Sequence, residues 1–151
     1  AELRPGKRTP LDLDEVKTKL QELLGEGPAA DFLTAQIALE TANGRGSYSY
    51  NVGNMKAEDE PGVRYQLLDT WEQENGKRVD RREPFLAFDS LDEGLKAYVE
   101  YQDRHGHLDA ADSGDLAGFN RSLKSKGYYT ADEAKYLKIL QDRLAAQKKS
   151  E

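Results

Sequence analysis

The sequence predicts a mainly helical α+β domain with one small β-hairpin lobe, and two patterns carry this expectation. Before residue 43 and after residue 90, apolar residues recur at the spacing of one face of an α-helix. Between these segments, two extended runs flank Asn75-Gly76, which is the strongest short-range signal for a tight hairpin. With 151 residues, the chain can bury its own core, so we expect a single domain over residues 11–146. Residues 1–10 are expected to be an N-terminal extension and residues 147–151 a solvated tail.

Two helices are predicted before the hairpin. The first apolar stripe runs from Leu13 to Leu24 and ends at the Gly-Glu-Gly-Pro segment 25–28. A second helix is expected over about 29–42. Segment 43–62 is rich in Gly, Asn, Ser and Tyr and has no helical period, so we expect a loop that lines a surface.

Helices return after the hairpin. The segments Ser90-Leu-Asp-Glu93 and Thr130-Ala-Asp-Glu133 both match the capping box, in which a hydroxyl and a later carboxylate satisfy free backbone donors. We therefore expect one helix to begin at each segment. A shorter helix is expected over 115–124.

Glu40 is the first functional candidate, because it lies on the apolar stripe of the second helix. It follows Leu33 and Ile37 at the i, i+4, i+7 spacing, and Asn43-Gly44 places it in the last turn, at the negative end of the helix dipole. Partial burial and the dipole both disfavour the carboxylate form. A glutamate that keeps its proton near neutral pH can act as the general acid of glycoside hydrolysis. The alternative is a structural ion pair with Arg45 or another cation.

The hairpin register separates two further glutamates. With a two-residue turn at Asn75-Gly76, Glu74 lies opposite Lys77 and is explained as a cross-strand ion pair. Glu72 lies opposite a valine and has no such partner, although solvent exposure would account for it. A hairpin that folds over a cleft could present Glu72 toward Glu40, which gives the pair of carboxylates that most glycosidases use.

The composition excludes several classes of function. The net charge is −6 with acids and bases interspersed, so neither nucleic acid nor a membrane surface is an expected partner. Cysteine is absent, which excludes disulfides, zinc-thiolate clusters and a cysteine nucleophile. No apolar run approaches the roughly 20 residues of a membrane span. The pair His105 and His107 lacks a matching carboxylate cluster, so we expect neither a metal nor a cofactor, and a monomer is the default.

Taken in order, these features resemble the peptidoglycan N-acetylglucosaminidases of glycoside hydrolase family 73. The segment Ala35-Gln-Ile-Ala-Leu-Glu40 is similar to the family helix that ends in the catalytic acid, and residues 50–57, Tyr-Asn-Val-Gly-Asn-Met-Lys-Ala, are similar to its Asn-x-x-Gly-x-Lys-Ala loop. Residues 70–76 resemble the hairpin strand and turn, residues 85–90 the entry to the next helix, and residues 127–130 the late Gly-Tyr-Ala-Thr segment. The resemblance covers roughly residues 29–144.

The resemblance implies a lysozyme-like fold, with the hairpin lobe over a substrate cleft, and cleavage of the β-1,4 bond between N-acetylglucosamine and N-acetylmuramic acid. Glu40 would be the general acid and Glu72 the second carboxylate, acting as a base, as a nucleophile, or as support for attack by the substrate's own acetamido group. Glycan strands of peptidoglycan would be the partner, and the workplace would be the periplasm, the cell wall or the cell exterior.

Aromatic and amide side chains complete the predicted site. Aromatic rings offer flat apolar area with a polar edge for pyranose faces. The expected substrate-binding residues are Tyr48, Tyr50, Asn51, Trp71, Tyr98 and Tyr128. Two alternatives remain open: a muramidase or lytic transglycosylase on the same fold, and a peptidoglycan-binding or assembly module without catalysis.

Overall fold

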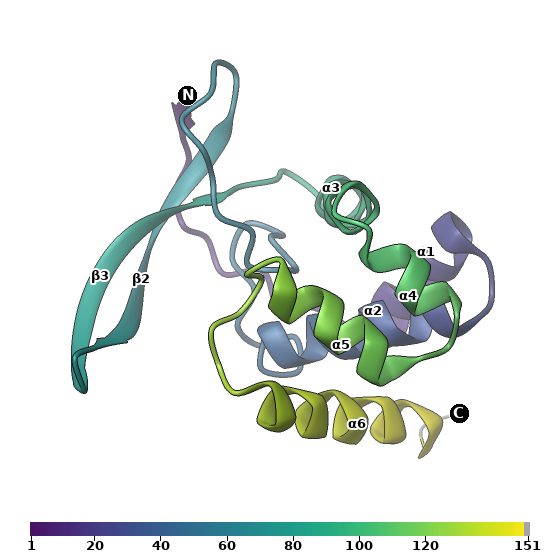
Figure 1. Ribbon diagram of the computed structural model, residues 1–151. Coiled ribbons are helices and arrows are strands. Elements are labelled where there is room, and N and C mark those ends of the chain that lie inside the picture. Colours follow the sequence, from purple (N-terminus) through teal and green to yellow (C-terminus); the bar gives the residue numbers. More distant parts are fainter. Residues whose placement is uncertain (150–151) are drawn as a thin grey trace.

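The computed structural model describes the backbone of residues 1–149 and their side chains, except for the side chains of residues 72, 73, 148 and 149. Within that range the chain forms a helical body and a three-stranded sheet that extends to one side of it (Figure 1). This arrangement confirms the predicted α+β class. Among the described residues, no helix combines the length and the hydrophobicity that crossing a membrane requires.

The body is built around α2 (Pro28–Glu40), which contacts α1 (Leu13–Leu24), α4 (His107–Asp112) and α6 (Glu133–Lys149). Residues 29–30 and 32–38 of α2 are buried. A helix that is covered on nearly all sides belongs to the centre of a core. The last residue of this central helix is Glu40, so the candidate acid is attached to a helix that is buried along most of its length.

The remaining helices cover α2 and close the body. They are α3 (Leu91–Arg104), which packs on α1 and α4, and α5 (Leu116–Ser125), which packs on α4 and α6. The predicted Ser90 cap is confirmed, because its hydroxyl accepts a hydrogen bond from the Glu93 N–H at 3.2 Å. The predicted Thr130 cap is wrong: α6 begins at Glu133, and it is Asp132 that accepts the Lys135 N–H.

The hairpin forms with the predicted register. Strands β2 (Arg64–Glu74) and β3 (Lys77–Leu86) pair so that Glu72 lies opposite Val79 and Glu74 opposite Lys77. Asn75 and Gly76 have φ of 52° and 76°, the left-handed pair that a type I′ turn needs. The ion pair of Glu74 differs from the prediction, because its carboxylate binds Arg81, whose longer side chain reaches along the same face, and not Lys77.

Two features of the chain ends differ from expectation. A short strand, β1 (Glu2–Leu3), pairs in parallel with the start of β2, so part of the N-terminal extension joins the sheet. At the other end, α6 continues through Lys149, and Gln147 donates a hydrogen bond to the Asp31 carbonyl at 3.2 Å. Of the expected tail, residues 150–151 lie outside the described residues.

Candidate active site

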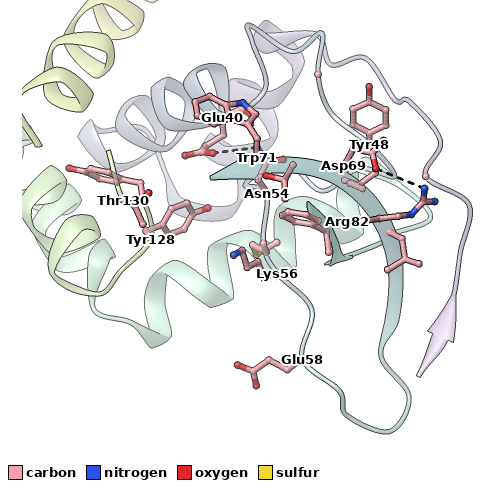
Figure 2. A pocket seen from close by; sticks show the side chains of 18 of the residues that line it. Glu40, Tyr48, Asn54, Lys56, Glu58, Asp69, Trp71, Arg82, Tyr128 and Thr130 are labelled. Atoms are coloured by element: carbon pink, nitrogen blue, oxygen red, sulfur yellow. Dashed lines mark hydrogen bonds and ion pairs between the residues drawn. The ribbon is translucent and has the colours of Figure 1, made fainter. Parts of the chain in front are cut away.

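A cavity of about 870 Å³ lies between the hairpin and the helical body, and Glu40 is part of its lining. Figure 2 shows Glu40 and Asn54 close together, with Tyr128 and Thr130 on one side and Tyr48, Asp69 and Arg82 on the other. The wall from the hairpin consists of residues 67–71, Arg82 and Phe85. The wall from the body consists of Tyr101 and residues 127–130, while Gly6, Gly46, Tyr48 and residues 54–56 and 58 complete the lining.

Glu40 reaches this cavity because α2 stops abruptly after it. The backbone N–H of Thr41 still bonds to the Ile37 carbonyl at 3.0 Å, and then Ala42, Asn43 and Gly44 all take positive φ. Three successive left-handed residues turn the chain away from the helix axis. The glutamate therefore stands at the carboxyl end of the helix, as the Asn43-Gly44 pair predicts.

Two neutral side chains hold the Glu40 carboxyl group. The Tyr136 hydroxyl donates to Oε1 at 2.7 Å, and the Asn54 amide donates to Oε2 at 3.3 Å and to the Glu40 backbone carbonyl at 2.6 Å. Among the described residues, Glu40 forms no ion pair, so the alternative of a structural pair with Arg45 does not hold. Burial raises the pKa of Glu40, and the two hydrogen bonds oppose that rise. The carboxyl group is therefore biased toward the protonated form that a general acid needs.

Tyr136 belongs to a buried polar network that the sequence did not indicate. The Gln36 amide group donates to the Tyr136 oxygen at 3.5 Å, and its carbonyl oxygen accepts hydrogen bonds from Tyr98 and Gln102. In the sequence, Tyr136 follows the late segment of the family resemblance and lies on an apolar stripe with Leu140 and Leu144, 96 positions from Glu40. The sequence offers one indication of a polar role for Tyr136: it carries a hydroxyl group at a position where the apolar face needs only a hydrophobic side chain.

Three of the predicted substrate-binding residues line the cavity: Tyr48, Trp71 and Tyr128. The structure does not bring the others to its surface. Asn51 is 2% exposed, and its amide holds the loop by donating to the Met55 and Leu86 carbonyls and accepting the Met55 N–H. Tyr98 is fully buried beneath the cavity, and Tyr50 lies outside the lining.

The hairpin and the loop before it bring further charged groups to the cavity. The backbone of Glu72 directly follows Trp71 in β2, and its side chain lies outside the described residues, so its role stays a prediction. Sequence analysis did not single out Asp69 or Glu58, which contribute carboxylates to the lining. Asp69 forms an ion pair with Arg82 at 3.9 Å. Both residues are exposed, and an exposed acidic residue in a loop or strand has no periodic or motif signal that would single it out.

The histidine pair is part of an aromatic cluster beside the cavity. His107 is buried, its Nδ1 lies 2.7 Å from the Ser122 hydroxyl, and burial lowers its pKa to about 4. Its ring packs edge-on against Tyr128 and stacks near His105. In the part of the chain that the structure describes, no group of three or more acidic or histidine side chains is arranged to hold a metal ion.

Comparisons with known proteins agree with this geometry. Residues 17–148 match the glucosaminidase family, described as mannosyl-glycoprotein endo-beta-N-acetylglucosaminidase. A mutant of a peptidoglycan hydrolase from Sphingomonas sp. A1 is 30% identical, with 89% of this chain and 92% of that chain covered and a TM-score of 0.60. No curated protein sequence matches significantly.

Two further structures share the fold. The truncated glycoside hydrolase domain of FlgJ from Salmonella typhimurium is 24% identical, with 90% of this chain and 93% of that chain covered and a TM-score of 0.62. The catalytic domain of the autolysin Auto from Listeria monocytogenes is 19% identical, with 89% and 81% covered and a TM-score of 0.67. The family match spans most of the chain, so this protein belongs to the glucosaminidase family, glycoside hydrolase family 73, and is a glycoside hydrolase with a lysozyme-like fold.

Proposed function

We propose that this glycoside hydrolase cleaves peptidoglycan at the β-1,4 bond between N-acetylglucosamine and N-acetylmuramic acid, with Glu40 as the general acid. The single observation that carries the residue assignment is the placement of Glu40. A half-buried carboxyl group, held by neutral donors, lies at the surface of the cavity between hairpin and body. The peptidoglycan hydrolase from Sphingomonas supports the choice of substrate. Action on peptidoglycan places the enzyme outside the cytoplasm, in the periplasm, in the cell wall or at the cell exterior.

In the proposed reaction, Glu40 transfers its proton to the glycosidic oxygen. The O–H bond of the carboxyl group breaks while the C–O bond to the anomeric carbon breaks, and the electron pair of that bond stays on the departing oxygen. Positive charge develops on the sugar ring, and the oxygen of a water molecule then bonds to the anomeric carbon. That water loses one proton, which over the whole cycle replaces the proton given up by Glu40. Glu72 on the hairpin supplies the second carboxylate in this proposal, and the walls formed by Tyr48, Trp71 and Tyr128 offer faces for the pyranose rings.

Analysis of the released fragments tests this function. Purified peptidoglycan is digested with the wild type, Glu40→Gln, Glu72→Gln and Glu58→Gln, and the fragments are reduced with borohydride before mass spectrometry. We expect new N-acetylglucosamine reducing ends from the wild type and from Glu58→Gln, which makes the same chemical change elsewhere in the cavity lining. Over the same time, Glu40→Gln should release about a hundredth of that amount or less. N-acetylmuramic or anhydro ends would indicate a muramidase or a lytic transglycosylase. Retained glycan binding without any released fragment, under conditions where a control enzyme works, would indicate a binding module.

A further inference from the structure

The Asn54 side chain contacts both the backbone and the side chain of the candidate acid, Glu40. Its amide nitrogen lies 2.6 Å from the Glu40 carbonyl oxygen and 3.3 Å from Oε2 of the same residue. The first contact satisfies a carbonyl at the end of α2 that has no partner within the helix. The second contact places a donor on the carboxyl oxygen that Tyr136 does not use.

The backbone around Asn54 is shaped for this contact. Asn54 itself has a φ of 51°, in the left-handed region that asparagine tolerates better than most residues. A Cβ at the preceding Gly53 would lie 2.5 Å from the Tyr128 hydroxyl and 2.6 Å from the Tyr98 ring. Tyr128 instead donates to the Gly53 carbonyl at 2.6 Å. The loop is therefore fixed against two tyrosines immediately before the residue that contacts Glu40.

The network behind Glu40 determines which carboxyl oxygen holds the acidic proton. Gln36 donates its amide hydrogen to the Tyr136 oxygen, so the single hydroxyl proton of Tyr136 is free to point toward Oε1. Oε1 is then an acceptor in both protonation states of Glu40. This arrangement leaves Oε2, the oxygen next to Asn54, as the carboxyl oxygen suited to carry the proton that Glu40 transfers.

We propose that Asn54 is a positioning residue for the general acid: its amide fixes the end of α2 and stabilises the charge that forms on Oε2 as the proton leaves. This inference rests on the function proposed above and names one more residue of the same site. A carboxylate accepts a hydrogen bond more strongly than a carboxylic acid does, so a donor at 3.3 Å gains strength as the proton is transferred. Asn54 thereby makes Glu40 a stronger acid than burial alone would leave it.

The test measures the titration of Glu40 directly. Asn54→Gly removes the amide and keeps a residue suited to positive φ, and it is the decisive variant. Asn54→Asp keeps the size of the side chain but replaces the donor by a carboxylate, whose like charge adds to any rise in the pKa of Glu40. Asn43→Gly is the matched control, since Asn43 has a φ of 61° and is exposed at the same helix end. The Glu40 carboxyl carbon is followed by ¹³C NMR across pH and assigned by its absence in Glu40→Gln. The pH profile of kcat is measured in parallel.

We expect both Asn54 variants to titrate Glu40 at higher pH than the wild type, with the alkaline limb of kcat shifted in the same direction. On the plateau below this limb, where Glu40 is fully protonated, kcat should fall roughly tenfold, because the carboxylate that forms loses one hydrogen bond. Asn43→Gly should match the wild type. A titration midpoint that stays in place or moves down in Asn54→Gly would overturn the inference. An inactive wild type would remove the proposed function, yet the NMR midpoint would still decide whether Asn54 acts on Glu40.

Discussion

The helical body and the hairpin hold their parts of the cavity in different ways. Glu40 follows nine buried residues of α2, so its position is fixed by the core. Along β3, by contrast, Phe85 is the one buried residue of the strand, and most others are exposed. The hairpin is held at its root, where the buried Gln66 donates to the Tyr48 and Leu86 carbonyls and Arg64 bonds to Glu93. The comparison indicates that core packing fixes the position of the acid. The opposite wall of the cavity, by contrast, is formed by a hairpin that is attached to the body at one end.

Replacing Glu40, the candidate acid of the helical body, should have the largest effect on activity. Glu40→Gln keeps the shape of the side chain but cannot donate the proton, so we expect kcat to fall by about 10²–10⁴, the usual contribution of a general acid. Binding of glycan fragments should be retained, because the walls of the cavity are unchanged. Measurement of kcat together with the Kd of a fragment checks this. A loss below tenfold would contradict the assignment of Glu40.

On the hairpin, substitution of Glu72 should lower the activity, whereas substitution of Glu74, two residues further along the same face, should not. We expect Glu72→Gln to lower kcat by about tenfold to a hundredfold, less than the change at Glu40. Glu74→Gln is the matched control, two residues along β2, and should stay near the wild type, because an exposed ion pair such as that with Arg81 contributes little. Initial rates on purified peptidoglycan distinguish the two variants. Equal losses would mean that the hairpin needs both carboxylates for its shape, which would remove the special role of Glu72.

Substitution of Trp71 tests whether the hairpin binds sugar. Its side chain is 54% exposed, lines the cavity and lies beside the Arg78 guanidinium at 5.2 Å. We expect Trp71→Ala to raise KM about fivefold with little change in kcat, which corresponds to a stacking contact of about 1 kcal/mol. The melting temperature should not change. Leu3→Ala, at a residue 57% exposed and outside the cavity lining, is the control. A fall in kcat at constant KM would argue against a binding role.

Sequence reasoning predicted the parts of the fold that depend on short-range patterns. The stripe from Leu13 to Leu24, the Asn75-Gly76 turn and the Ser90 cap each depend on residues close in the chain, and all three are confirmed. It missed α4, whose six residues are too few to show a helical period, and β1, whose two residues gain a partner only through β2. It also misplaced the start of α6, where Thr130 lines the cavity and does not cap the helix.

The same limit applies to the site. The position of Glu40 at a helix end was predictable, because its apolar neighbours and the turn that follows lie within a few residues. Its hydrogen-bond donors were not, since Asn54 and Tyr136 lie 14 and 96 positions away and have no pattern that links them to it. A sequence can therefore indicate a buried carboxyl group from local spacing, but what tunes that group depends on tertiary contacts.

The smallest expected effect concerns stability, and it separates the half-buried acid from the exposed carboxylates of the cavity. Burial raises the pKa of Glu40 in the folded protein above its ordinary value of 4.5, so between these two values the unfolded chain binds fewer protons than the folded protein. Rising pH through this window therefore favours unfolding, and the loss of stability is complete above the folded pKa. We expect Glu40→Gln to lack this loss and to exceed the wild type at neutral pH by about 1 kcal/mol, as is common when a functional residue is replaced.

Urea unfolding at a series of pH values measures this difference. Glu58→Gln, at an exposed glutamate of the cavity lining, should follow the wild type across the whole series. If the curves of Glu40→Gln and the wild type ran in parallel from acid to neutral pH, the Glu40 carboxyl would ionise equally in the folded and unfolded states. In that case the helical body would not raise the pKa of Glu40. The body and the hairpin would then differ only in how they hold their residues in place.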